Sequence, residues 1–418
     1  MRHSQFSALQ RCFISLGVTV ALVLTPAAGA TAREKVLYRF TGGTDGAYPS
    51  SSLVLDASGP LYGTTSAGGN TNECTGSDSQ GCGVVFELTS SNGKWQESVL
   101  YAFQGGTDGW DPSGNLLFDA AGNIYGTTLY GGTGTGCTSG CGTVFELSPN
   151  GDGSWTETVL HSFQADFDGA FPAGLTADAS GNLYGVTTSG WGTVYELSPS
   201  QGGAWKEARL CSTNSSSPGL VLEDKDNLYF TQGSTYEYGS VSEVKRIGKL
   251  WHETDLYDFH GGGNGGEPKA GVIVDKDGNL YGTGDEGGND FGIAFELKRS
   301  AGQWKESMLY NFCSRNNCAD GARPQAPLVF DQAGNLYGTT ANGGTGCTFQ
   351  GGCGVVFKLA HTKAGWMETV LHTFRDGRDG ASPTQGLTLD GKGNIYGTTP
   401  AGGAGPNGGY GTVFEVTP

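Results

Sequence analysis

Apolar and polar residues alternate along this chain in segments of four to nine residues, and no segment shows the period of an amphipathic helix. In one representative stretch these segments are rich in β-branched and aromatic residues and are bounded by turn-forming residues: they are Asn115–Phe118, Asn123–Thr128, Thr143–Leu147 and Trp155–Phe163. The segments are joined by short turns of Asp, Asn, Ser and Gly, which favour hairpins. The pattern therefore predicts a four-stranded antiparallel meander.

The meander is one copy of a unit that occurs seven times. Each unit opens on a variant of Val-Leu-Tyr-x-Phe and continues through Asp-Gly-x-x-Pro, Leu-Tyr-Gly-Thr-Thr, a Gly-rich stretch, Gly-Val-Val-Phe-Glu-Leu and Trp-x-Glu. The units begin near residues 36, 99, 159, 209, 255, 308 and 370. Units of this length with four strands each are typical of β-propellers. The fourth unit departs furthest from the pattern, and we expect it to form the weakest blade.

The two ends of the chain distinguish a closed ring from a linear β-solenoid. The seventh unit stops after Gly411–Val416 without a fourth strand, whereas Arg33–Phe40 reads as a fourth strand with no unit before it. A ring gains from this offset, because pairing the first strand with the last removes both open sheet edges. We therefore predict an all-β fold over residues 31–418, a seven-bladed β-propeller of four-stranded antiparallel blades. Residues 31–40 complete its seventh blade.

The N-terminal segment predicts export. Residues 1–30 carry two Arg and no acidic residue, then an apolar stretch, then Ala28–Ala30, which together are typical of a signal peptide. No later segment is apolar for long enough to span a membrane. The formal net charge of -17 argues against nucleic acid and anionic lipid as partners. We expect a secreted or periplasmic monomer with no membrane insertion.

The cysteines predict disulfide bonds. Export to an oxidising compartment favours pairing of cysteines that lie close in sequence, and the chain offers four such pairs: Cys74 and Cys82, Cys137 and Cys141, Cys313 and Cys318, and Cys347 and Cys353. The last two pairs fall in neighbouring loops, so local and crossed pairing are both open. Cys211 is left without a nearby partner.

Candidate ligand-binding residues gather on one predicted face. In an up-and-down blade, the loop that enters a blade and the loop between its second and third strands lie at the same end of the sheet. Aromatic residues occur in these loops in the first three units: Tyr48, Trp110, Tyr130, Phe171 and Trp191. Aromatic side chains on variable loops are suited to stacking on sugar rings or to binding a protein. We predict a glycan or an extracellular protein as the partner.

Five units carry an Asp in the Asp-Gly-x-x-Pro turn: Asp45, Asp108, Asp168, Asp320 and Asp379. Clustered carboxylates at the channel mouth could hold Ca²⁺. The fourth unit, however, lacks both this Asp and the Thr pair of the second strand. This joint loss favours a structural role, with each Asp bound within its blade to a Thr hydroxyl or a backbone amide of the second strand. No other cofactor is predicted.

The string Gly-Asn-Ile/Leu-Tyr-Gly-Thr-Thr, seen at Gly122–Thr128 and Gly334–Thr340, precedes Gly-Val-Val-Phe-Glu-Leu and Trp-x-Glu in most units. In these motifs the chain from Val36 to Pro418 resembles the Gly-rich Gloeobacter/Verrucomicrobia-type (GloVer) tandem-repeat proteins of bacteria. The resemblance implies an exported repeat protein and transfers no catalytic residues.

Three functions remain open from the sequence. The favoured one is an exported, non-catalytic propeller that binds its ligand through the loop-rich face. The first alternative is a carbohydrate-active lyase or hydrolase that uses acidic residues near the channel mouth, such as Asp45, Asp108 and Asp168. The second alternative is a structural protein of the envelope or matrix. No catalytic residue can be named from the sequence, because no nucleophile, zinc or phosphate-binding motif occurs.

Overall fold

The computed structural model describes residues 32–69, 74, 80–189, 192–213, 216–233, 238–300, 302–347, 351–403, 405 and 408–418. The chain divides into two units, Met1–Thr31 and Ala32–Pro418, and all described residues belong to the second. The signal peptide lies outside the described residues, so it stays a prediction.

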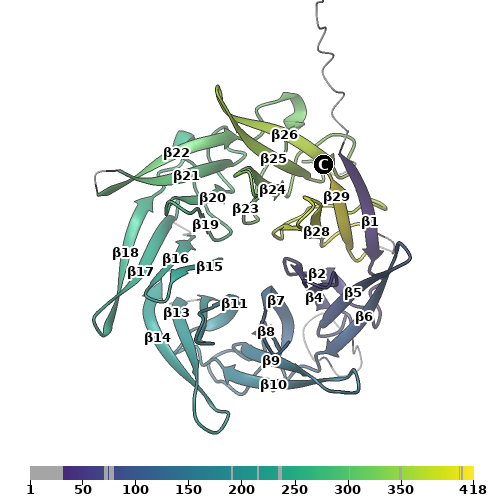
Figure 1. The fold of residues 1–418 in the computed structure, drawn as a ribbon, viewed down its shortest axis with the longest axis vertical. Coiled ribbons are helices and arrows are strands. Elements are labelled where there is room, and N and C mark those ends of the chain that lie inside the picture. The colour runs from purple at the N-terminus through teal and green to yellow at the C-terminus, as the bar shows by residue number, and fades with distance from the viewer. Residues whose placement is uncertain are drawn as a thin grey trace, which may run out of the picture. The chain divides into compact units, whose positions relative to one another are not determined.

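The strands of Ala32–Pro418 form seven antiparallel sheets around a common centre, here called blades 1 to 7 (Figure 1). Blade 1 contains β2 (Ala47–Pro49), β3 (Val54–Leu55), β4 (Leu61–Ala67), β5 (Val84–Ser91) and β6 (Lys94–Ala102). Blade 2 contains β7 (Trp110–Phe118), β8 (Ile124–Tyr130), β9 (Thr143–Pro149) and β10 (Trp155–Ser162). Blade 3 contains β11 (Ala170–Ala177), β12 (Leu183–Ser189), β13 (Gly192–Pro199) and β14 (Trp205–Thr213). Blade 4 contains β15 (Ser216–Asp224), β16 (Asn227–Gln232), β17 (Ser240–Ile247) and β18 (Leu250–Asp258).

Blade 5 contains β19 (Ile273–Val274), β20 (Leu280–Gly284), β21 (Ile293–Ser300) and β22 (Gln303–Asn311). Blade 6 contains β23 (Val329–Phe330), β24 (Leu336–Thr340), β25 (Val355–Thr362) and β26 (Gly365–Thr373). Blade 7 contains β27 (Thr388–Leu389), β28 (Ile395–Thr399), β29 (Thr412–Thr417) and β1 (Arg33–Arg39). Two short 3-10 helices, η1 (Gly262–Asn264) and η2 (Asn316–Cys318), lie in loops. The predicted seven-bladed propeller is confirmed.

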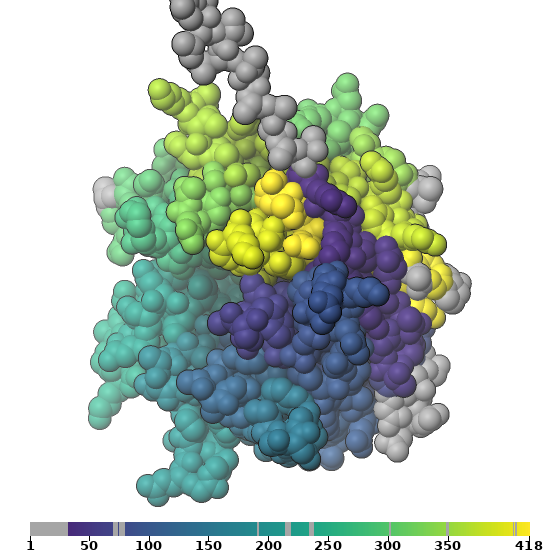
Figure 2. Space-filling view, turned by 45° about the vertical axis from the view of Figure 1, so that its right-hand side comes forward, coloured from purple at the N-terminus to yellow at the C-terminus, as the bar shows by residue number. Residues whose placement is uncertain are grey.

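The N-terminal strand closes the ring. Strand β1 pairs antiparallel with β29, with Arg33 opposite Thr417 and Arg39 opposite Thr412. The purple start of the described chain lies beside its yellow end in both views (Figures 1 and 2). Phe40, which follows β1, is completely buried. The predicted closure is confirmed, and its physical reason is that each otherwise unpaired edge strand gains a partner.

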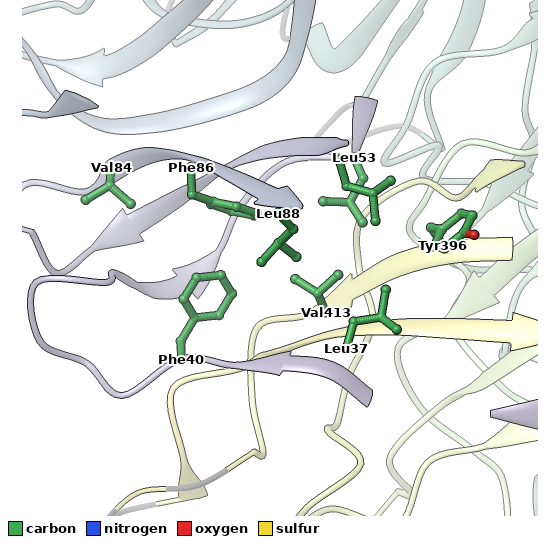
Figure 3. Packing of buried hydrophobic residues seen from close by; sticks show 9 residues of the cluster. Leu37, Phe40, Leu53, Val84, Phe86, Leu88, Tyr396 and Val413 are labelled. Atoms are coloured by element: carbon green, nitrogen blue, oxygen red, sulfur yellow. The ribbon is translucent and has the colours of Figure 1, made fainter. Parts of the chain in front are cut away.

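The core is built from aromatic pairs between neighbouring blades. The Phe that ends each Val-Leu-Tyr-x-Phe phrase packs against the aromatic residue of the following Val-Val-Phe-Glu-Leu strand, with ring centroids 4.9–5.2 Å apart. Six such pairs occur: Phe40–Phe86, Phe103–Phe145, Phe163–Tyr195, Phe259–Phe295, Phe312–Phe357 and Phe374–Phe414. Figure 3 shows the first of them among the buried aliphatic residues of blades 7 and 1. Such edge-on pairs add to the gain from burying apolar area.

Blade 4 fills its core differently. Ser242 stands in the place of the strand-three Phe, and Phe230, directly opposite on β16, stands where the other blades have Gly. Phe230 is completely buried. The aromatic ring has therefore moved from the third strand to the second, so the divergent fourth unit still forms a complete four-stranded blade.

The close packing around the Gly of Leu-Tyr-Gly-Thr-Thr leaves no room for a side chain, as Gly338 illustrates. A Cβ at Gly338 would lie 2.6 Å from the ring of Phe357 and 2.9 Å from the Leu328 side chain. We expect Gly338→Ala to lower the free energy of unfolding by about 1–3 kcal/mol in urea denaturation, because a packed core resists added volume. The control is Gly391→Ala, where a Cβ meets nothing within 4 Å. Equal stability of the two variants would contradict this account.

Candidate functional site

Six residues occupy one equivalent and unusual position on six blades. Each precedes the proline of its inner strand and has a left-handed backbone with φ between 48° and 61°: they are Tyr48, Asp111, Phe171, Glu267, Arg323 and Ser382. The amide of each donates a hydrogen bond of 2.7–3.0 Å to a carbonyl in the second-to-third-strand loop of the preceding blade. Left-handed backbone is costly for residues other than Gly and is often found at functional positions. The backbone is thus the same in all six blades, while the side chain differs in every one.

Three of the five predicted aromatic residues meet on blades 2 and 3. Trp110 and Tyr130 stack with centroids 4.3 Å apart and an interplanar angle of 21°. Tyr130 also contacts Phe171, with centroids 5.2 Å apart. All three are half-buried. Tyr130 lies at the end of β8 and bridges the two residues that enter blades 2 and 3.

The other two predicted aromatic residues do not join this cluster in the described structure. Tyr48 packs on Tyr410 of the last blade, with centroids 5.9 Å apart. Trp191 lies outside the described residues. The aromatic cluster is therefore defined as Trp110, Tyr130 and Phe171.

A pocket of about 260 Å³ adjoins the aromatic cluster. Trp110 forms one part of its wall, and Gly-rich backbone with two hydroxyl residues, Thr138 and Ser139, forms the rest. The disulfide between Cys137 and Cys141 closes the short loop that holds these two residues. An indole ring beside hydroxyl groups and backbone polar groups suits a ligand with an apolar face and hydroxyl edges.

The four predicted disulfides are present in their local pairing, and the crossed alternative is excluded. Three of them brace loops between second and third strands, and the fourth, Cys313–Cys318, braces the loop that enters blade 6. Cys211 is the free cysteine among the described residues. Burial raises the pKa of its thiol to about 12, so it is a poor nucleophile at neutral pH. Disulfides thus stiffen the loop-rich face.

The five turn aspartates are bound locally and do not converge. Asp45 accepts hydrogen bonds from the Tyr38 hydroxyl at 3.0 Å and from the Thr41 amide at 2.8 Å. Three others repeat this hydrogen bond with the aromatic residue of the preceding outer strand: Asp108 with Tyr101, Asp168 with His161 and Asp320 with Tyr310, each at 2.7 Å. In the fifth, the Asp379 carboxylate lies 3.5 Å from the His372 ring without a hydrogen bond between them. Within the described ranges, no three His, Cys, Asp or Glu residues are placed to hold a metal ion.

The prediction that these aspartates bind a Thr hydroxyl or a backbone amide of the second strand is therefore wrong. The partner is the Tyr or His of Val-Leu-Tyr-x-Phe, because the entry turn folds back on the strand that precedes it. Blade 5 keeps the contact with different groups, since the Asn264 amide donates to the Tyr257 hydroxyl at 3.1 Å. The fourth unit has neither partner: Cys211 stands in the place of the Tyr. The joint loss of Tyr and Asp in the fourth unit was the signal in the sequence that these two residues contact each other.

Charged residues at the left-handed positions of blades 5 and 6 were missed by sequence reasoning. Glu267 pairs with Lys269 at 2.8 Å, and Arg323 pairs with Asp285 at 3.1 Å. Asp285, almost fully buried, also accepts a hydrogen bond from Gln325 at 3.0 Å. These residues could have been found in the sequence by comparing the residue before the recurring proline from unit to unit. Blades 1 to 3 thus present aromatic groups at the loop-rich face, and blades 5 and 6 present ion pairs.

Asp111 adds a titratable group next to Trp110. Burial raises the pKa of its carboxyl to about 6. A carboxyl with this pKa changes charge near neutral pH, and such groups are common at functional sites.

Comparisons with known proteins place the chain in a repeat family. The sequence model described as the Gloeobacter/Verrucomicrobia repeat matches residues 73–246 and 230–418. Among curated proteins, none matches the chain significantly. Within the described residues, no helix is long and apolar enough to cross a membrane.

Solved structures share the fold at 13% sequence identity. One is a catalytically inactive virginiamycin B lyase from Staphylococcus aureus with quinupristin, with a TM-score of 0.55 over 93% of this chain and 99% of that chain. Another is the extracellular domain of a protein described as a hybrid two-component system from B. thetaiotaomicron, with a TM-score of 0.53 over 92% of this chain and 41% of that chain. A third, described as a 6-phosphogluconolactonase from Bacteroides fragilis, has a TM-score of 0.50 over 80% and 85%. Identity this low shows the fold alone.

Proposed function

We propose that this chain, which belongs to the Gloeobacter/Verrucomicrobia repeat family and folds as a propeller, is an exported, non-catalytic protein that binds a glycan. The binding site is the pocket beside the aromatic cluster on the loop-rich face. Export is supported by the four disulfides, which persist in oxidising compartments. Residues 1–30 supply the signal peptide, and the protein acts as a monomer.

The observation that carries the proposal is Trp110 itself. In the equivalent place five of the other units have Ala or Gly, such as Ala47, Ala170 and Ala322, each of which is buried, and the fourth unit has Ser. The repeat pattern therefore does not require a large ring at this position. The indole ring of Trp110 forms part of the wall of a pocket whose other groups are hydroxyls and Gly backbone. Sugar rings have apolar faces and hydroxyl edges, which match these two kinds of surface.

The test is binding to a glycan array, followed by titration of the best ligand. We expect Trp110→Ala to weaken that ligand's affinity at least about tenfold, because loss of a stacked aromatic contact costs on the order of 1.4 kcal/mol or more. Tyr48→Ala is the matched control, since Tyr48 is also half-buried on the loop-rich face but packs on Tyr410. Its affinity should stay within about twofold of wild type.

Two outcomes would contradict the proposal. One is equal affinity in Trp110→Ala and wild type, with unchanged melting temperature. The other is binding to an extracellular protein and to no glycan, which would identify the surface as a protein interface.

A further inference from the structure

A second cavity, of about 570 Å³, lies at the centre of the ring and is lined by residues of all seven blades, in the inner strands or in the segments that lead into them. It is separate from the Trp110 pocket, because the two share no lining residue. The inner strands around it fall into two classes. Those of blades 2 to 4 (β7, β11 and β15) are continuous over eight or nine residues, whereas β19, β23 and β27 of blades 5 to 7 have only two residues each.

The wall formed by blades 2 to 4 offers few polar groups to a ligand. Here the backbones approach closely: a Cβ on Gly114 would lie 2.3 Å from the amide nitrogen of Gly174. The polar side chains of this wall are Ser113, Asn115 and Thr176. Asn115 is already used, since it donates to the Leu175 carbonyl at 2.8 Å and accepts from the Leu175 amide at 3.1 Å. Leu117 and Leu175 also line this side of the cavity. Apart from these three side chains, the wall consists of Gly, Leu and Val residues.

The wall formed by blades 5 to 7 carries polar side chains at one repeat position. Lys269, Gln325 and Thr384 each stand two residues after the left-handed residue of their blade, and all three line the cavity. In blade 2 the same position holds Ser113, a smaller polar residue that also lines the cavity, and in blade 3 it holds Ala173, which does not. The backbone is repeated, so the difference between these blades lies in the side chains they present to the cavity.

Most of these groups can donate hydrogen bonds to a ligand. Among the described residues Lys269 bonds only to Glu267, and Gln325 uses one amide hydrogen on Asp285. The Thr384 hydroxyl makes no hydrogen bond to another described residue, and neither does the carboxamide of Gln385, which also lines the cavity. The polar wall therefore combines an ammonium group, two carboxamides and a hydroxyl.

The charged groups that line the cavity differ from those of the chain as a whole. The protein has 41 Asp and Glu residues, yet none of the described residues that line the cavity is acidic, and Lys269 is its single charged group. Ammonium and amide donors bind carboxylate oxygens more strongly than neutral acceptors. A cavity of this composition selects an acceptor-rich anion over a metal ion or an organic cation.

We propose that the central cavity is a second ligand site, which binds a small hydroxylated carboxylate of the uronic acid type. The carboxylate lies against Lys269, Thr384 and Gln385, and the ring of the ligand lies against the apolar wall of blades 2 to 4. The inference does not depend on glycan binding at Trp110.

Calorimetric titration with glucuronate, and with glucose as the uncharged analogue, tests the proposal. We expect glucuronate to bind wild type, glucose to bind at least about tenfold more weakly, and Lys269→Met to lose at least about tenfold in glucuronate affinity. Glu267→Gln is expected to strengthen glucuronate binding, because it frees the ammonium group from its internal partner. The controls are Lys276→Met, which removes an exposed lysine of a turn in the same blade, and Trp110→Ala. Both should bind glucuronate as wild type does.

The Lys269 side chain is 44% exposed, so its replacement should leave folding intact, and the melting temperature of each variant checks this. Three results would each overturn the proposal: no glucuronate binding at millimolar concentration, equal affinity for glucose, or unchanged affinity in Lys269→Met. Loss of glucuronate binding in Trp110→Ala would assign the carboxylate to the aromatic pocket and would also overturn it.

Discussion

Deletion of residues 33–40 should unfold or aggregate the protein. The deletion removes β1, the outer strand of blade 7, and leaves β29 with an unpaired edge. It also removes Leu37 and Phe40, which are buried in the core between blades 7 and 1 (Figure 3). Loss of two such side chains costs about 5 kcal/mol or more, which is comparable to the whole stability of many domains. An open sheet edge adds a template for aggregation.

Thermal melting and light scattering after size-exclusion chromatography measure this effect. The matched control is a chain that begins at Ala32, which lacks residues 1–31 and keeps β1. We expect the control to melt cooperatively as a monomer and the deletion variant to show no cooperative transition. A monomeric deletion variant with the control's melting temperature would refute ring closure as the source of stability.

The second large effect should be a loss of stability as the pH rises from 5 to 8. The glutamate of Trp-x-Glu, or its counterpart in β1, lies between neighbouring outer strands. In six blades it has a buried carboxyl oxygen that makes no hydrogen bond: the residues are Glu34, Glu97, Glu157, Glu207, Glu306 and Glu368. Burial, helped by the nearby Asp45, raises the pKa of Glu97 to about 7. Burial and Asp108 raise the pKa of Glu157 to about 8.

A carboxyl whose pKa is raised by folding contributes its full stability below the unfolded pKa of about 4.5 and loses it as the pH rises through the folded value. Here that window is about pH 5 to 8, and each of the two groups should cost about 1 kcal/mol across it, because solvent around these partly exposed carboxyls screens the larger cost that the pKa shift alone implies. Asp119 and its counterparts in the other Asp-x-x-Gly-Asn turns act in the opposite sense. Burial raises the pKa of Asp119, but its hydrogen bonds with Asn123 and other turn groups outweigh this and lower it. Their contribution is lost only in strong acid, so we expect maximal stability near pH 5.

Urea denaturation at pH 5 and pH 8 measures this effect in wild type and Glu157→Gln. The amide does not ionise, so the variant should lose less stability between the two pH values than wild type does. Ser98→Ala, an exposed change on an outer strand, is the control and should keep the wild-type pH dependence. Equal or greater stability of wild type at pH 8 would contradict this account of the buried glutamates.

Much of the fold could be predicted because each blade repeats its own local signals. The offset between Gly411–Val416 and Arg33–Phe40 identified the closed ring before any contact was known, and the Asp-x-x-Gly-Asn turns fold as their residues indicate. The disulfides could be predicted from the spacing of the cysteines, because each bond closes a short loop between residues that are close in sequence.

The candidate site could be predicted only in part, because it depends on which loops meet across blades. Tyr48 and Phe171 stand at the same repeat position, yet only Phe171 joins Trp110. Tyr130 bridges blades 2 and 3, whereas Tyr48 faces Tyr410, which ring closure brings from the other end of the chain. A repeat pattern shows which positions are equivalent and does not show which neighbours fill the space beside them.

The central functional claim is that a glycan binds beside Trp110, and hydrogen exchange with and without the best array ligand tests it most directly. The account predicts that bound ligand slows amide exchange in residues 106–110 and 131–140, which contain the pocket wall, and leaves the Asp-x-x-Gly-Asn turns at the opposite end of the blades unchanged. Protection confined to those turns, or absent from both pocket segments at saturating ligand, would contradict it.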